Sequence, residues 1–267
     1  MLRSVFTKTL YDARRNWPAW ALGVIATVAF VGAVYPSFRH SSQIDDLLKN
    51  YPDALKSLFG IAPGTEFSSG QGYLQSELFS FMLPILMLVA AISWGARAIA
   101  GEEEAGTLDV LLSTPRSRTV VYLHKAAASL LLVLGLAAVA FVSLCIADPL
   151  WSLGVPVAHL AAAVVATTLF VVHLGAIALA VGAARGHRGL ALGTAAGISV
   201  FAFLWNGLAP LVGGLAHWRW VSPWYHALGH DPLGHGLDLG GTAVLLGTTA
   251  IWLVVGGLAF TRRDIGA

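Results

Sequence analysis

The order of apolar and polar residues divides the chain into six long hydrophobic runs separated by more polar segments. A helix that crosses a bilayer needs roughly 20 mainly apolar residues in succession, and each run meets that requirement. The predicted spans are residues 17–35, 78–100, 126–146, 157–184, 190–215 and 239–260. Gly, Ala and Leu dominate these runs, and small residues let helices pack closely in lipid. The pattern therefore predicts an all-α polytopic membrane protein with six transmembrane helices in a single domain, residues 1–267.

Residues 1–16 predict a different kind of helix, one that lies on a membrane surface. Its apolar face would hold Leu2, Val5, Phe6, Leu10 and Ala13. Its polar face would hold Arg3, Lys8, Asp12, Arg14 and Arg15. A basic polar face suits an anionic leaflet. A simple topogenic signal is the alternative, but an apolar stripe over three turns favours the interfacial helix.

Two long polar segments are expected outside the membrane on one side. Residues 39–72 contain two short amphipathic patterns, and the second has Pro52 near its start and Gly60 past its end, as short helices often do. Residues 213–239 are half apolar and rich in Trp, which favours a re-entrant or surface-lying element over a free loop.

Composition supports the membrane assignment. Hydrophobic residues make up 57% of the chain and the mean hydropathy is +0.73, whereas soluble domains rarely exceed about half apolar residues. If both termini are cytoplasmic, twelve of the 16 Lys and Arg residues lie inside, since the outside ones are Arg39, Lys49, Lys56 and Arg219. The positive-inside rule favours that orientation. The one cysteine, Cys145, lies in the third span and supports no disulfide framework.

The segment between the second and third spans, residues 101–118, reads GEEEAGTLDVLLSTPRSR. A helix beginning near Gly101 has three acidic residues in its first turn, where the helix dipole favours negative charge. These residues are Glu102, Glu103 and Glu104. Leu108, Leu111 and Leu112 would then share one face, before Pro115 ends the helix. The spacing predicts one amphipathic helix over residues 102–113. A helix with a dedicated functional role and an ordinary interfacial loop helix fit this spacing equally well.

Several common catalytic and nucleotide-binding signatures are missing from the sequence. It contains no GxxxxGK[ST] phosphate loop, no HExxH and no GxSxG. No predicted span carries a row of carboxylates of the kind that proton relays use. The chain is therefore expected to do little catalysis by itself.

The longer string ARAIAGEEEAGTLDVLLSTPRSRTVVYLHK resembles the signature of ABC-exporter permeases of the type-2 (ABC2 membrane) family. The matching positions are Glu102, Glu104, Gly106, Thr107, Leu108, Leu111, Leu112, Pro115, Arg118 and Lys125. The rest of the chain agrees in layout, with an N-terminal interfacial helix, six spans and two long connecting segments.

The resemblance implies that two permeases pair and that each docks on a separate ABC ATPase subunit. Residues 102–113 would be the coupling helix. The coupling surface would consist of the matching residues from Glu102 to Arg118, together with Glu103. ATP and Mg would bind to the ATPase, and this chain would bind no cofactor. The protein would sit in the cell membrane with both termini in the cytoplasm. It would export an amphipathic small molecule, such as a drug, an antibiotic or a lipid-like compound. The pairing partner would be an identical copy or a paralogue.

Polar residues inside the spans are candidates for a translocation path. They are Glu77, His173 and Asn206. A lone His or Asn more often bonds to a neighbouring helix, so packing is the competing interpretation. Pro84 in the second span predicts a kink, or neighbours that satisfy the freed carbonyl.

Histidines gather in the segment before the sixth span. His226 and His230 are four residues apart, a spacing that can place two metal ligands on one helical face, and His235 follows. Glycines and prolines interrupt this segment, so no metal site is predicted and headgroup-level residues are the favoured interpretation.

Two other functions compete with the exporter: an integral-membrane enzyme and a secondary transporter. An integral-membrane enzyme acting on lipids or peptides needs a nucleophile or metal constellation that the sequence does not offer. A secondary transporter usually needs buried ionisable residues or broken-helix repeats, and the spans contain few. The exporter permease explains the charged segment and the basic N-terminus together.

Overall fold

The computed structural model describes residues 4–39, 68–113 and 115–264, and within these residues the chain is helical, with no strand. Six helical segments there are long and apolar enough to cross a membrane. They are Trp17–Ser37, Gly70–Glu104, Arg118–Trp151, Val157–Arg185, Arg188–Leu211 and Leu239–Arg262. Each contains all or most of one predicted span, which confirms the prediction of an all-α polytopic membrane protein.

The spans are built from the following elements. In chain order they are α2 (Trp17–Val34) with η1 (Tyr35–Ser37); α5 (Gly70–Tyr73), η2 (Leu74–Met82), α6 (Leu83–Ala96), η3 (Arg97–Gly101) and α7 (Glu102–Glu104); α9 (Arg118–Trp151); α10 (Val157–Arg185); α11 (Arg188–Leu208) with η4 (Ala209–Leu211); and α14 (Leu239–Arg262).

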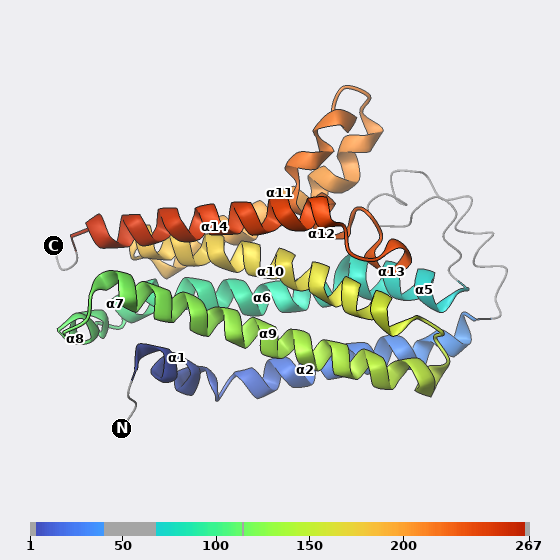
Figure 1. The fold of residues 1–267 in the computed structure, drawn as a ribbon, viewed down its shortest axis with the longest axis horizontal. Coiled ribbons are helices and arrows are strands. Elements are labelled where there is room, and N and C mark those ends of the chain that lie inside the picture. Colours follow the sequence, from blue (N-terminus) through green and yellow to red (C-terminus); the bar gives the residue numbers. More distant parts are fainter. Residues whose placement is uncertain (1–3, 40–67, 114, 265–267) are drawn as a thin grey trace.

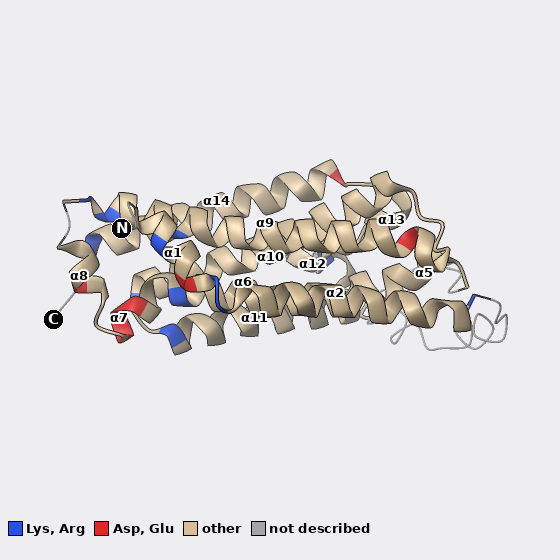
Figure 2. Cartoon of the chain, turned by 90° about the horizontal axis from the view of Figure 1, so that it is seen from below, with Lys and Arg blue, Asp and Glu red and all other residues tan. Residues whose placement is uncertain are grey.

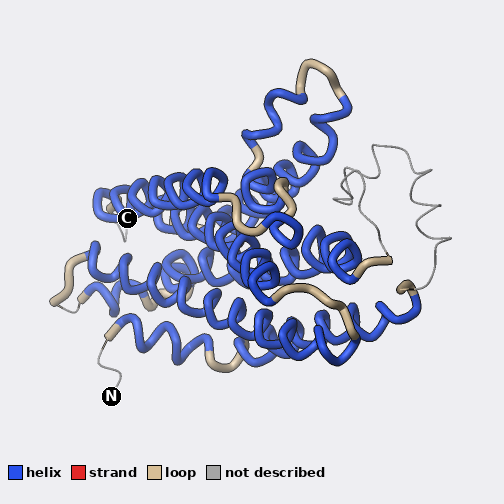
Figure 3. The backbone as a smooth tube through the Cα atoms, turned by 45° about the vertical axis from the view of Figure 1, so that its right-hand side comes forward, coloured by secondary structure: helices blue, strands red, loops and turns tan. Residues whose placement is uncertain are grey.

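The long helices lie side by side along the longest axis of the molecule (Figure 1). Both termini lie at one end of the bundle, together with α1 (Val5–Ala13), α7 and α8 (Leu108–Leu112). We call this the terminal end. The other end, where α5 and α13 (Pro232–His235) lie, is the opposite end. The tube view of Figure 3 shows the same bundle, in which helices make up most of the described chain and short loops connect them.

The fourth span, α10, is the central helix of the bundle. In its most hydrophobic stretch 72% of the residues are buried, against 17% in the fifth span and 22% in the sixth. It packs against α6, α9, α11 and α14. Two glycines bring neighbours close: a Cβ on Gly95 of α6 would stand 2.3 Å from the Gly175 carbonyl oxygen, and one on Gly256 of α14 would stand 2.6 Å from the Ala180 Cα. Close backbone approach of this kind favours helix association in lipid.

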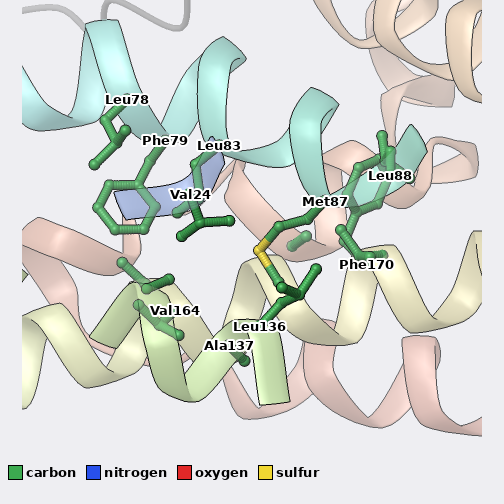
Figure 4. Packing of buried hydrophobic residues seen from close by; sticks show 14 of the residues in the cluster. Val24, Leu78, Phe79, Leu83, Met87, Leu88, Leu136, Ala137, Val164 and Phe170 are labelled. Atoms are coloured by element: carbon green, nitrogen blue, oxygen red, sulfur yellow. The ribbon is translucent and has the colours of Figure 1, made fainter. Parts of the chain in front are cut away.

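Apolar side chains from four spans interlock in the centre of the bundle (Figure 4). Phe79, Leu83 and Met87 of the second span meet Leu136 of the third and Phe170 of the fourth in one cluster, and each of them is at most 1% exposed. Since lipid tails are as apolar as these side chains, close packing rather than water exclusion holds the spans together.

The second span contains a π-helical stretch, η2, directly before Pro84. The Leu83 backbone N–H donates to the Leu78 carbonyl, five residues earlier. Proline lacks the N–H that would serve a carbonyl one turn back, and a π turn redistributes the bonds around it. The Ser80 hydroxyl also donates to the Gln75 carbonyl at 2.7 Å. The proline was predicted to produce a kink or a rescued carbonyl, and the structure has this local change of helix type.

The predicted end of the fifth span was wrong by several residues. We predicted residue 215, but α11 ends at Leu208 and the 3-10 turn η4 carries the span only to Leu211. The physical reason is Pro210 inside η4, followed by Gly213 and Gly214, which together end regular helix.

The segment between the fifth and sixth spans turns back onto the bundle. The short helix η5 (Ala216–Val221) belongs to a hairpin that projects away from the bundle, upward in Figure 1. After it, α12 (Pro223–Leu228) returns to pack against α10, α11 and α14. Trp224 is 4% exposed, with its ring 4.5 Å from Phe170 and 5.2 Å from Phe203, centroid to centroid. Whether this segment is re-entrant or lies on the membrane surface stays a prediction.

The N-terminal segment forms the predicted helix, α1, which a capping box at Ser4 begins. Val5 is buried and α1 packs along α9. The two short amphipathic helices predicted within residues 39–72 lie outside the described residues.

Candidate functional site

Charged residues concentrate at the terminal end of the bundle, around α1, α7 and α8 (Figure 2). The segment between the second and third spans lies there, with α7 and α8 joined by a turn and followed by α9. This segment, residues 101–118, is the candidate functional site, because it combines the acidic run with the leucines singled out in the sequence.

The single helix predicted over residues 102–113 is wrong. The structure ends α7 at Glu104 and starts α8 at Leu108. Gly106 adopts a φ of +66°, its N–H donates to the Glu103 carbonyl at 2.9 Å, and the Thr107 N–H donates to the Glu102 carbonyl at 2.9 Å. This pair of bonds is a Schellman motif, which ends a helix and favours glycine at the left-handed position. Gly106 and Thr107 therefore have a clear structural role as a helix stop.

Glu102 lies between two lysines from different helices. Its Oε1 accepts a hydrogen bond of 2.9 Å from Lys8 Nζ of α1 and a second one from Lys125 Nζ of α9. The Lys125 side chain is 2% exposed and that of Glu102 is 13% exposed. A buried lysine needs such a partner, because an unpaired charge in this environment is strongly destabilising.

Lys8 is the exposed member of this trio. Burial acts to lower the pKa of Lys8, but the hydrogen bond to Glu102 and the charges of Glu102 and Asp12 outweigh it. The pKa of Lys8 therefore lies above its usual 10.5, and the side chain stays charged at any physiological pH. The trio ties α1 to the second and third spans.

Glu103 contacts the far end of the chain. Its Oε2 forms an ion pair with the guanidinium of Arg263, which directly follows α14. Arg118, the first residue of α9, donates to the backbone carbonyl of the same Arg263. These two contacts hold the end of the sixth span against the acidic segment and the start of the third.

Glu104 caps the fifth span. Its Oε1 accepts a hydrogen bond of 2.8 Å from the backbone N–H of Arg188, the first residue of α11. His187, at the N-cap position, makes no side-chain capping bond. The carboxylate therefore supplies both the missing acceptor and a negative charge at the positive end of the helix dipole.

The leucines of α8 also face inward. Leu108 is 1% exposed and packs with Ile99, Tyr122 and Phe260 in a small core of its own. Leu111 and Leu112 pack against the same core and are partly buried. Pro115 lies beyond the end of α8 and is exposed.

The exposed part of the segment is consequently different from the predicted one. The sequence predicted a surface of glutamates and leucines, but most of these side chains contact the rest of the chain. The exposed residues are Glu104, the turn residues 105–107, Asp109 and Val110 of α8, and residues 113 and 115–117, and Val110 is 71% exposed. A role of the predicted residues in coupling stays a prediction.

The sequence alone does not identify the partners of the glutamates. In the sequence, Lys8 belongs to the polar face of the predicted interfacial helix, Arg188 and Arg263 count only among the basic residues expected inside, and Lys125 belongs to the family signature. Lys8 is 94 residues from Glu102 and Arg263 is 160 residues from Glu103, so no local pattern signals these pairs.

The three candidates for a translocation path lie at separate places. His173 is 6% exposed, and its Nδ1 lies 3.1 Å from the Thr249 hydroxyl, between α10 and α14. Asn206 accepts a hydrogen bond of 3.0 Å from Arg219 Nε. Glu77 lies half-buried on η2. Within the described residues, no hydrogen bond or ion pair joins the three.

The three histidines considered as metal ligands each lie close to an oxygen atom of the protein. His226 Nε2 lies 2.6 Å from the Trp220 carbonyl oxygen, His230 Nδ1 lies 3.4 Å from Asp238 Oδ2, and His235 Nδ1 lies 3.9 Å from Asp231 Oδ2. Among the residues that the structure describes, no group of three or more His, Cys, Asp or Glu side chains is arranged to hold a metal ion.

A family model described as ABC-2 family transporter protein matches residues 3–265. No protein with a curated description matches the sequence.

Proposed function

Because this chain belongs to the ABC-2 transporter family, we propose that it is the membrane-spanning permease subunit of an ATP-driven exporter. The observation that carries the proposal is the family match over residues 3–265, which includes all six spans. In this proposal a separate ABC ATPase binds ATP and Mg, and the permease itself is not catalytic and binds no cofactor.

The terminal end is proposed to face the cytoplasm, where the ATPase would bind. Among the described residues, the Lys and Arg residues at the opposite end are Arg39 and Arg219, and the others lie at or near the terminal end. This distribution favours the terminal end as the inside by the positive-inside rule. The protein would then sit in the cell membrane with both termini in the cytoplasm.

Within this frame, the segment of residues 101–118 has two faces with two roles. The exposed turn and outer face of α8, including Asp109 and Val110, would contact the ATPase. The three glutamates would pass a displacement of the segment to the helices that they hold. Those helices are α1 and α9 through Glu102, α14 through Glu103 and α11 through Glu104.

A second copy of the permease is proposed to pack against α11. The exposed face of α11 carries Gly189, Gly193 and Gly197, spaced four residues apart. A Cβ on any of them would meet no atom within 4 Å. Phe201, 61% exposed, continues the same face toward the opposite end. Small residues at this spacing allow two helices to approach closely in lipid. A paralogue with a matching helix is the alternative occupant.

The exported compound is proposed to be an amphipathic small molecule. Of the three candidates for its path, Glu77 is the one whose carboxylate we propose to line it. His173 and Asn206 bond to neighbouring segments, which favours a packing role for both.

The proposal is tested by co-purification with the ATPase and by the ATP hydrolysis of the complex. Val110→Glu places a charge on the exposed face of α8 and should abolish capture of the ATPase while leaving thermal unfolding of the permease unchanged. Arg185→Glu, an exposed change at the same end in the last residue of α10, is the matched control. If Val110→Glu retains full capture and full stimulated ATP hydrolysis, the outer face of α8 is not the contact.

A further inference from the structure

A pocket of about 270 Å³ lies at the terminal end, between α1, the last turns of the second span and α9. Neither the family match nor the proposed coupling assigns it a role. Its walls combine charged and apolar side chains: Lys8 and Asp12 come from α1, Arg97 and Glu102 from the second span, and Lys125 from α9.

The charges around the pocket leave one cation unneutralised. Lys8 and Lys125 share Glu102, and Lys8 also lies 3.4 Å from Asp12. Arg97 is exposed and lines the pocket, and it makes no ion pair or hydrogen bond to another side chain among the described residues. Three cations against two carboxylates give the lining a net charge of +1, which favours an anion.

The residues that line the pocket indicate its level relative to the lipid headgroups. Trp94 lines it, as does Leu132, whose carbonyl oxygen accepts a hydrogen bond of 3.1 Å from the Trp17 indole N–H. Tryptophans of membrane proteins concentrate at the level of the lipid headgroups. The amphipathic helix α1 forms the outer wall, as expected for an element at the same level. A pocket at that level would face the phosphates of the lipid headgroups.

We propose that this pocket binds the phosphate of an anionic phospholipid headgroup, with Arg97 as its principal ligand. A guanidinium presents several N–H donors in a planar fork that matches phosphate oxygens. Asn16 and Ser129 line the same space and offer further donors. Ala98, Trp94 and Leu132 form an apolar wall suited to the glycerol and the first acyl carbons.

The volume of the pocket favours a lipid headgroup over a transported substrate as its occupant. Sites for drug-sized ligands usually enclose roughly 300–1,000 Å³, so a volume of 270 Å³ suits a headgroup better than a whole amphipathic substrate. A bound headgroup would bridge α1 to the second and third spans beside the Glu102 ion pairs. The inference does not depend on the ATPase or on transport.

The test is native mass spectrometry of the purified full-length protein, offered equal amounts of phosphatidylglycerol and phosphatidylcholine. The wild type should retain phosphatidylglycerol preferentially. Arg97→Gln should lower that retention by about tenfold, as expected when one charge-assisted contact is removed. Arg185→Gln, an exposed arginine at the same end outside the pocket, should retain the wild-type preference.

Thermal unfolding supplies a second reading that does not rely on lipid retention. Added phosphatidylglycerol should raise the unfolding temperature of the wild type and of Arg185→Gln, but not that of Arg97→Gln. Unchanged lipid preference in Arg97→Gln would overturn the proposal. Inorganic phosphate that produces the whole shift by itself would overturn the lipid as the source of the anion.

Discussion

The Glu104 carboxylate accepts a hydrogen bond of 2.8 Å from the backbone N–H of Arg188, which connects the segment between the second and third spans to the first turn of the fifth span. This contact is one of three in which adjacent glutamates hold different parts of the bundle. The acidic run thus acts as an internal junction at the terminal end, and its removal should have structural consequences that can be measured.

Glu104→Ala should lower the free energy of unfolding by about 0.5–2 kcal/mol, the usual cost of losing a helix cap. Glu104→Gln keeps a side-chain carbonyl acceptor and should lose less. Thermal or denaturant unfolding in a fixed detergent measures both. Asp109→Ala, an exposed acidic position in the same segment, is the control and should be close to neutral. Equal losses for Glu104→Ala and Asp109→Ala would mean that the cap contributes nothing.

Glu102→Ala should be the more severe change, because it leaves the buried Lys125 without a partner. We expect a loss of about 3–5 kcal/mol. Lys8→Ala removes the partly exposed partner, 37% of whose side chain is accessible, and should cost at most about 1 kcal/mol. Combining Glu102→Leu with Lys125→Met buries no charge and should recover much of the loss. No recovery in the double variant would contradict the ion-pair explanation.

Gly106→Ala should destabilise the turn between α7 and α8 by about 1–2 kcal/mol, because φ at this position is +66°. The cost is purely conformational, since an added Cβ meets no atom within 4 Å. Gly214→Ala has equally open surroundings without a positive φ and serves as the control. The measurement is the unfolding temperature of each variant relative to the wild type. An unchanged unfolding temperature in Gly106→Ala would exclude the helix-stop role.

Asp238 should make stability depend on pH in the acidic range. Its carboxylate accepts hydrogen bonds from the N–H groups of Gly241 at 2.8 Å and Gly240 at 3.0 Å, at the start of α14. The bond from Gly241 is the main cause that holds the pKa of Asp238 below its usual 3.8, and the nearby His230 acts in the same direction. A lowered pKa means that the stabilisation is complete above about pH 3.8 and disappears as pH falls through the folded-state pKa.

Asp238→Asn keeps a capping oxygen but cannot titrate, so its unfolding temperature should vary less than that of the wild type between pH 5 and about pH 3. The difference between the two pH profiles is the quantity to measure. Parallel profiles would show that this carboxyl group does not control acid stability.

The proposed pairing of two permeases through α11 predicts a specific cross-link. Gly193→Cys places a thiol on the exposed glycine face and should yield a covalent dimer on mild oxidation in membranes. The control is a cysteine at Leu246, which is 53% exposed on α14 and should cross-link far less. Both variants are made after Cys145 is replaced by Ala. Cross-linking at Leu246 but not at Gly193 would move the interface to the sixth span.

The sequence analysis and the structure differ most at the acidic segment. Three glutamates in a first helical turn were consistent with an exposed docking surface, and the sequence contained no information on where their carboxylates point. The structure directs Glu102 toward Lys8, Glu103 toward Arg263 and Glu104 toward Arg188. Likewise, the leucine stripe was recognised correctly as amphipathic, but its apolar face packs on Tyr122 and Phe260.

The sequence by itself determined the six spans, because hydrophobicity and helical length are local properties that the bilayer thickness selects. It did not determine where two of the helices stop, because the predictions ran through Gly106 and Pro210, at or near which the structure ends regular helix. Only the tertiary structure decided which charges pair, since Glu103 and Arg263 are 160 residues apart and Glu104 and Arg188 are 84 apart. Such contacts depend on how the spans pack around α10, and packing places residues next to each other that no sequence period relates. The acidic run is therefore a local feature of the chain whose partners are set by the whole bundle.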